Sequence, residues 1–208
     1  FFVTGFFDVS ASGNQGNDDG KAATASKATL HGVGEFWGIL MDQNGDTIWR
    51  RYFGGSSNDR SYDVVETDDD GFIIIGSSES VDFDITDNKG SYDYWMVRVD
   101  SNGNKLWAKS LGGSEIDQGY GITKTEDGNF IIVGDTRSAD GDVSALNGNA
   151  DAWVVKFSPD GNIIWEKTYG GAAFDSAKSI VGLQNGNFAI VGNTRSSMDG
   201  FINRGQND

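Results

Sequence analysis

The chain of 208 residues has no cysteine, one proline and one histidine. The absence of cysteine excludes disulfides, thiolate metal sites and cysteine nucleophiles together. A Ser-His-Asp triad or a histidine-rich zinc site would have to rely on His31, which lies in the segment LHGVG and is poorly placed to hold a general base. The chain also has no G-x-S-x-G motif, P-loop or dinucleotide-binding fingerprint.

Positive charge is scarce, with 16 basic residues against 31 acidic ones and a net charge of −15. This charge disfavours nucleic acid and anionic membrane surfaces as partners, because like charges repel. Calcium and basic partners are compatible with this negative charge. No apolar run approaches the roughly 18 to 20 residues of a membrane-spanning helix, so we expect no transmembrane segment. No basic leader precedes Phe1, and we expect the numbering to begin inside a longer gene product.

What the chain has in abundance is glycine, tryptophan and internal repetition. Its 30 glycines are about twice the roughly 7% of an average protein, which together with many short apolar runs indicates a turn-rich all-β protein. Pairs of glycines and several aspartates recur every 58 residues, as do the tryptophans. The six tryptophans form two such series, namely Trp37, Trp95 and Trp153, and Trp49, Trp107 and Trp165.

Each repeat contains four strand-like pieces joined by short turns. In the second repeat, residues 94–100 lead through SNGN into 105–110, and residues 120–126 lead through DGN into 130–134. Asn-Gly and Asp-Gly steps between apolar runs are the strongest short-range signal of a β-hairpin, because these residues accept positive φ. The sequence therefore predicts two hairpins per repeat.

This pattern predicts an all-β fold, a β-propeller built from four-stranded antiparallel blades of 58 residues. The nearly continuous apolar strands fit sheets that are covered on both faces. A solenoid is the structural alternative, although 58 residues is long for one coil. We expect three complete blades plus one strand, a fragment of a larger ring whose remaining blades come from a missing part of the chain or from a partner. The expected divisions are 1–7 (last strand of a preceding blade), 8–35 (inserted surface loop) and three blade repeats, 36–93, 94–151 and 152–208.

An acidic loop follows each repeat's last strand. The loops DFDITDNKGSYD (82–93), DGDVSALNGNAD (140–151) and MDGFINRGQND (198–208) align with one another. One interpretation is a crossover between blades, whose terminal aspartate caps the incoming strand and whose glycine allows a tight turn. The other is calcium binding, although the loops lack the spacing and the final glutamate of an EF-hand. The carboxylates that would bind calcium are Asp82, Asp84, Asp87, Asp93, Asp142 and Asp151.

Recurrence also bears on the other candidate residues. A catalytic pair of carboxylates should be unique around a central site, whereas recurring residues imply the same task in each blade. We therefore interpret Asp59, Asp117 and Asp175, each four residues after a Gly-Gly pair, as turn caps that accept backbone N–H groups. The periodic tryptophans are interpreted as packing residues and not as a stacking platform for a ligand.

Three aligned segments carry a family resemblance, LMDQNGDTIWRRYFGG, RVDSNGNKLWAKSLGG and KFSPDGNIIWEKTYGG, with T-x-D-G-N-F-I-I-V-G downstream. Together they resemble the tandem propeller repeats of large secreted surface proteins of the Bacteroidota, which often end in a type IX secretion sorting domain. The resemblance covers essentially the whole chain. It implies a location outside the cell or on its outer surface, and a binding or adhesive role toward a protein or glycan.

The hairpins are also similar to those of quinoprotein-type propellers, which share an Asp, a Gly and a docking Trp. Asp42, Gly45 and Trp49 match this pattern, as do the equivalent residues of the second repeat, whereas Ser158 replaces the aspartate in the third. The quinone-dependent dehydrogenases of that class commonly carry a vicinal cysteine pair, which this chain lacks.

Three functional hypotheses follow from these observations. The first is a non-enzymatic binding or adhesion scaffold, a propeller segment of a secreted or cell-surface protein, with no cofactor other than calcium. The second is a propeller enzyme, either a quinone-dependent dehydrogenase or a glycoside hydrolase. The third is a structural subunit of a surface protein assembly.

Overall fold

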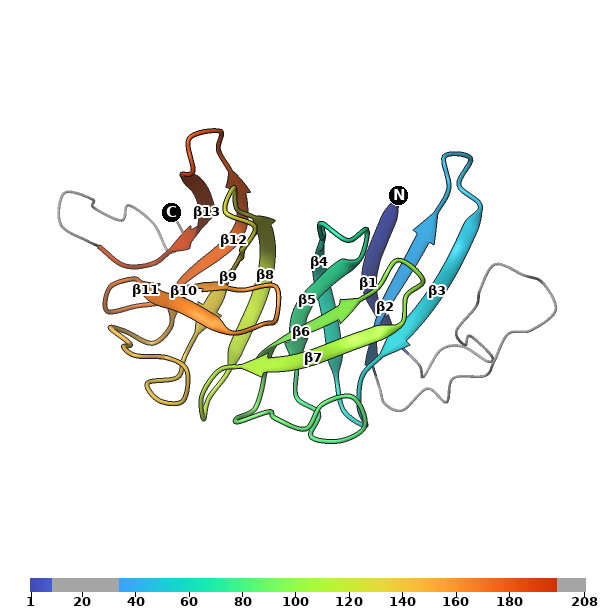
Figure 1. Ribbon diagram of the computed structural model, residues 1–208. Coiled ribbons are helices and arrows are strands. Elements are labelled where there is room, and N and C mark those ends of the chain that lie inside the picture. Colours follow the sequence, from blue (N-terminus) through green and yellow to red (C-terminus); the bar gives the residue numbers. More distant parts are fainter. Residues whose placement is uncertain (9–33, 198–208) are drawn as a thin grey trace. The chain divides into compact units, whose positions relative to one another are not determined.

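The computed structural model describes residues 1–8 and 34–197, and every element within these ranges is a β-strand (Figure 1). His31, most of the predicted insertion and the third acidic loop lie outside the described residues. In the described part of the chain, no helix has the length and apolar character needed to span a membrane. The predicted all-β class is confirmed.

The strands follow one another at intervals that repeat along the chain. Their bounds are β1 Phe2–Asp8, β2 Gly34–Met41, β3 Thr47–Phe53, β4 Asp59–Glu66, β5 Phe72–Ser78, β6 Asp93–Val99, β7 Lys105–Leu111, β8 Asp117–Lys124, β9 Phe130–Thr136, β10 Asp151–Phe157, β11 Ile163–Tyr169, β12 Asp175–Gly182 and β13 Phe188–Thr194.

The strands form antiparallel sheets in which sequence neighbours lie side by side. Two sheets have four strands, β4-β5-β6-β7 and β8-β9-β10-β11, while β1-β2-β3 and β12-β13 form smaller sheets among the described residues. The predicted four-stranded antiparallel sheets are thus present. They do not coincide with the 58-residue divisions expected from the sequence, because each joins the second hairpin of one repeat to the first hairpin of the next.

The hairpin turns have the backbone geometry that their sequences predict. Gly45, Gly103 and Gly161 each have positive φ, between 73° and 87°. At the first of these turns, Asp42 accepts the N–H groups of Asn44 and Asp46 at 2.8 and 2.9 Å. Glycine supplies the left-handed conformation and the aspartate satisfies the turn's donors, so the strands are joined with little strain.

The chain divides into two compact units, residues 1–88 with 95–110 and residues 89–94 with 111–208. In the first unit, the ring of Trp95 lies 4.3 Å from that of Phe36, centroid to centroid, within an apolar core. In the second, the ring of Trp153 lies 4.6 Å from that of Tyr94. Both indoles are fully buried, so the interpretation of these tryptophans as packing residues is confirmed.

The other tryptophans are buried to differing degrees. Trp49 is buried, and its Nε1 donates to the carbonyl of Ser101 at 2.9 Å in the following hairpin. Three more indoles are half-buried, those of Trp37, Trp107 and Trp165.

The two fully buried indoles differ in their polar atom, which gives a testable contrast. Trp153 Nε1 donates to Glu166 at 2.7 Å, whereas Trp95 Nε1 is buried without a hydrogen-bond partner. Both Trp→Phe changes remove similar volume, but only Trp153→Phe breaks a hydrogen bond to a carboxylate. We expect Trp153→Phe to lower the free energy of unfolding by about 1–3 kcal/mol more than Trp95→Phe. Urea unfolding of the two variants measures this, and equal losses would show that the Glu166 contact contributes nothing.

Candidate functional site: the acidic corners

Buried carboxylates gather where each repeat turns from one sheet into the next. We call each such place a corner: a Gly-Gly pair, the aspartate four residues later, and the acidic loop that approaches them. The aspartates that open β4, β8 and β12 are almost fully inaccessible, with exposed fractions of 0%, 0% and 3% for Asp59, Asp117 and Asp175. Buried charge is costly unless it is hydrogen-bonded, so the contacts of these groups decide what a corner can do.

The second corner shows how the central aspartate is held. Asp117 Oδ2 accepts the N–H of Gly113 and the hydroxyl of Ser138, both at 2.8 Å. Its Oδ1 accepts the hydroxyl of Thr136 at the end of β9. The predicted capping of backbone N–H groups is confirmed. The same three donors recur in the other corners, from Gly55, Ser78 and Ser80 to Asp59 and from Gly171, Thr194 and Ser196 to Asp175.

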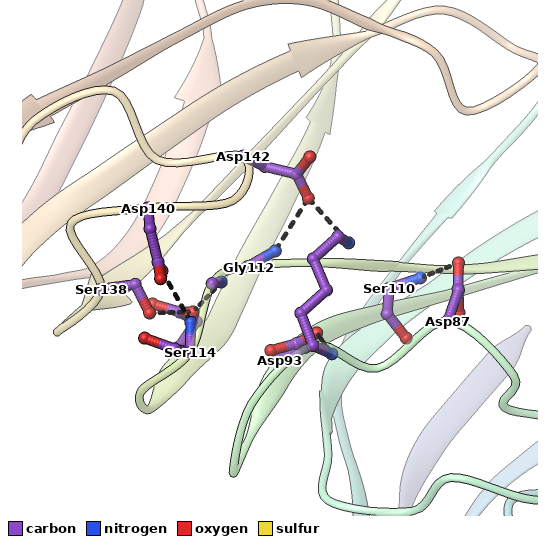
Figure 2. Close-up of polar contacts among 11 residues, drawn as sticks. Asp87, Asp93, Ser110, Gly112, Ser114, Ser138, Asp140 and Asp142 are labelled. Atoms are coloured by element: carbon purple, nitrogen blue, oxygen red, sulfur yellow. Dashed lines mark hydrogen bonds and ion pairs between the residues drawn. The ribbon is translucent and has the colours of Figure 1, made fainter.

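The acidic loop supplies further acceptors to the Gly-Gly segment (Figure 2). Asp142 Oδ2 accepts the N–H of Gly112 at 3.1 Å, and Asp140 Oδ1 accepts that of Ser114 at 2.8 Å. In the first corner, Asp84 and Asp82 accept the N–H groups of Gly54 and Ser56 in the same way. These loops join adjacent strands of one sheet, β5 to β6 and β9 to β10, so the interpretation of them as crossovers between blades is wrong. Their acids satisfy backbone donors of the Gly-Gly segment.

In the two acidic loops that the structure describes, Gly90 and Gly148 are required by a close approach of two chain segments. A side-chain carbon at Gly148 would lie 2.1 Å from the carbonyl oxygen of Gly171, and one at Gly90 would lie 2.3 Å from that of Gly113. Neither glycine has positive φ. The expectation that this glycine serves a tight turn therefore gave the wrong physical reason, because the loop needs room against the corner.

The structure places the six carboxylates predicted to bind calcium at separate backbone contacts. Asp82, Asp84 and Asp142 accept the N–H groups described above, and Asp87 Oδ2 accepts the N–H of Ser110 at 3.0 Å. Lysine side chains neutralise two of the six, since Lys105 pairs with Asp84 and Lys89 Nζ lies 2.9 Å from Asp142.

The last two of the six, Asp93 and Asp151, open the tryptophan-bearing strands and are fully buried. Each accepts through Oδ2 the N–H of a loop residue four positions earlier, Lys89 and Asn147, both at 2.7 Å. Their Oδ1 atoms are buried and have no hydrogen-bond partner in the structure. Each aspartate thus caps its own loop, leaving one oxygen unsatisfied.

Burial and like charge shift the pKa values in the corners. Burial raises the pKa of Asp93 to about 7, and the nearby Asp117 and Asp142 add to the effect. Burial likewise raises the pKa of Asp59 to about 6 and raises that of Asp151. For Asp175 burial acts in the same direction, but the hydrogen bonds from Ser196 and Thr194 outweigh it and its pKa is lowered.

Some corner residues escaped the sequence analysis although the repeat contained a signal for them. The hydroxyl residues Ser78, Thr136 and Thr194 follow the central aspartates by 19 positions. Glu35 occupies the first corner as Asp93 and Asp151 occupy the others, since its Oε2 would lie 2.9 Å from a side-chain carbon at Gly54. It recurs at the same 58-residue spacing but falls within the predicted insertion, 8–35.

One charged cluster departs from the repeat. The Ser176 hydroxyl donates to Asp135 Oδ1 at 2.6 Å, and Lys178 Nζ lies 3.6 Å from the same oxygen. The Lys178 ammonium also lies 3.4 Å from the ring centroid of Tyr120. Burial raises the pKa of Asp135 and lowers that of Lys178.

Comparisons with known proteins give one partial relative. No protein-family model matches the chain. The chain is 24% identical over 121 residues to the regulatory protein FlaEY of Caulobacter vibrioides (strain ATCC 19089 / CIP 103742 / CB 15), which covers 55% of this chain and 13% of that protein. The chain thus spans a small part of the relative's length.

The calcium hypothesis stays a prediction. Within residues 1–8 and 34–197, no three His, Cys, Asp or Glu side chains come together in a group that could hold a metal ion. Melting the protein in excess calcium and in chelator tests the hypothesis. Because a ligand at about 100 times its Kd stabilises by about 2.7 kcal/mol, a corner that binds calcium would melt measurably higher in calcium. From the separate engagement of the six carboxylates we expect equal midpoints.

The central aspartate should dominate the stability of its corner. Asp117→Ala leaves two hydroxyls and one N–H without their acceptor in a buried site, whereas Asp140→Ala removes one contact from an exposed carboxylate. We expect Asp117→Ala to lower the free energy of unfolding by about 3–5 kcal/mol and Asp140→Ala to lower it by about 1 kcal/mol, as measured by urea denaturation. Similar losses for both variants would contradict this ranking.

Proposed function

We propose that the sheets are blades of a β-propeller and that the chain is a non-enzymatic binding scaffold of a secreted or cell-surface protein. The observation that carries this proposal is that recurring and differing residues of the repeats occupy different places. The recurring acids are engaged in backbone contacts, while side chains that differ between repeats lie on the first strand of each sheet.

The differing residues occupy equivalent positions of β4, β8 and β12, and all of them except the buried Ser176 are at least partly exposed. Where β4 and β8 have Tyr62 and Tyr120, β12 has Lys178. Two positions earlier the residues are Arg60, Gln118 and Ser176. In a propeller the first strand of each blade lies nearest the central axis, so these side chains would line the channel. A blade structure that recurs, with residues on its inner strand that vary, suits a scaffold whose binding specificity is set by those variable residues.

The chemistry of these positions suggests the class of partner. An aromatic ring, a half-exposed ammonium and an amide can contact the apolar faces and hydroxyls of a glycan, or the side chains of a protein. The net charge of −15 favours a neutral or basic partner over an acidic one. The resemblance to Bacteroidota surface proteins supports the outer cell surface or the extracellular space as the location.

The enzyme alternative has less support from the described residues. A glycoside hydrolase would need two carboxyl groups flanking the scissile bond. Asp135, the buried carboxylate that departs from the repeat, instead faces Ser176 and Lys178. The relative is described as a regulatory protein, and a match over 13% of its length transfers no activity to this chain.

Variants on the inner strand test the binding proposal. We expect the purified protein to bind components of a glycan array or intact cell surfaces, and Tyr120→Ala and Lys178→Ala to weaken that binding at least about tenfold. Lys167→Ala, an exposed lysine on β11, is the matched control and should bind as the unaltered protein does. Circular dichroism confirms that each variant is folded.

Two results would contradict the proposal. One is equal loss of binding in the Lys167→Ala control. The other is turnover of an alcohol, sugar or glycoside by the purified protein, with or without added quinone, which would favour the enzyme.

A further inference from the structure

We propose that each corner holds one proton between two buried carboxyl groups, Asp93 with Asp117 and Asp151 with Asp175, and that Glu35 and Asp59 form the equivalent pair. The corners are then pH-sensitive joints that are most stable when this proton is bound. The proposal is independent of the partner that the scaffold binds.

The two carboxyl groups of a corner meet across the first glycine of the Gly-Gly pair. A side-chain carbon at Gly112 would lie 2.6 Å from both Asp93 Oδ1 and Asp117 Oδ2. At Gly170 the distances to Asp151 Oδ1 and Asp175 Oδ2 would be 2.4 and 2.8 Å. In each of the two corners, the two oxygens therefore face the same small space, and all four carboxyl groups are buried. Two full negative charges so placed repel strongly, which favours retention of one proton.

The hydrogen bonds in the second corner differ between the two members of the pair. Asp117 accepts three donors, whereas Asp93 accepts only the N–H of Lys89, and its Oδ1 is buried without any donor to accept from. An oxygen in that position is satisfied if it carries the proton and donates it toward the neighbouring carboxylate. Asp151 has the same unsatisfied Oδ1 beside Asp175, so the arrangement occurs in both corners of the second unit.

The charged neighbours of these groups leave a proton as the simplest neutralising species. Asp93 faces Asp117 on β8, together with Lys89 and Asp142, but the Lys89 ammonium lies against Asp142. Asp151 faces Asp175 on β12 and the amide of Asn147. Calcium would need about six to eight oxygen ligands, and the oxygens of Asp117 already accept three donors. A proton needs neither the volume nor the ligands.

The direction of the pH effect follows from linkage. An aspartate in an unfolded chain has a pKa of about 3.9, and burial raises the pKa of Asp93 to about 7 and that of Asp59 to about 6. At pH values between the unfolded pKa and the folded pKa, the folded protein binds more protons than the unfolded chain. Its stability therefore falls as pH rises from about 4 to about 7, the reverse of the behaviour of an aspartate in a salt bridge.

The test compares the unfolding midpoint of the protein between pH 5 and pH 8.5 with that of Asp93→Asn/Asp151→Asn. The amide of asparagine imitates the protonated acid at every pH. We expect the midpoint of the unaltered protein to fall across this range and that of the double variant to fall less, with equal or higher stability at pH 8.5. Asp127→Asn is the control and should leave the slope unchanged, because that exposed carboxylate pairs with Lys156 and its pKa is lowered.

Infrared difference spectroscopy gives a second readout that does not depend on the variant folding. The C=O stretch of a protonated carboxyl group should be present at pH 5.5, lost at pH 8.5 and reduced in the double variant. A midpoint that does not fall with pH, or the absence of the carboxylic band in the unaltered protein, would overturn the proposal. So would a rise in its midpoint at pH 8.5 on adding calcium that the double variant lacks, because the corner would then hold a metal cation.

Discussion

The buried aspartate of each corner is the contact on which the repeated architecture depends. Asp117 joins three chain segments, because its donors come from the Gly-Gly turn before β8, from the end of β9 and from Ser138, just before the acidic loop. A buried carboxylate is tolerated only when several donors surround it, so each segment must keep its position for the others to be stable. The aspartates thus fix where β4, β8 and β12 begin, separately from the apolar cores.

The crowding of acids around this point also explains the Gly-Gly pair. A side-chain carbon at Gly113 would lie 2.3 Å from Asp140 Oδ1, just as one at Gly112 would lie 2.6 Å from Asp93 and Asp117. Neither glycine has positive φ. The pair is required because carboxylates from three directions approach the backbone too closely for any side chain. The 58-residue repeat thus contains two separate sets of structural residues, those of the polar corners and those of the aromatic packing.

Much of the local structure could be predicted from the sequence, because it depends on short-range rules. The hairpin turns at Gly45, Gly103 and Gly161, the buried indoles and the capping role of Asp117 all follow from residue type and spacing. Sheet membership could not be predicted, because β5 and β6 are joined by an acidic loop that carries no register signal. The partners of Asp93 also depend on tertiary approach, so its carboxyl could be identified as a candidate without revealing its neighbour.

The half-repeat offset between the sequence period and the sheets has a consequence for how such chains evolve. A 58-residue segment that begins at β4 contains a whole sheet, because β4 to β7 lie between Asp59 and Leu111, whereas one that begins at β2 carries hairpins of two sheets. The point at which a segment is duplicated therefore decides whether the new copy brings a complete sheet or must share one with its neighbour. Duplication between the Gly-Gly turns that precede β4, β8 and β12 lengthens the array by whole sheets.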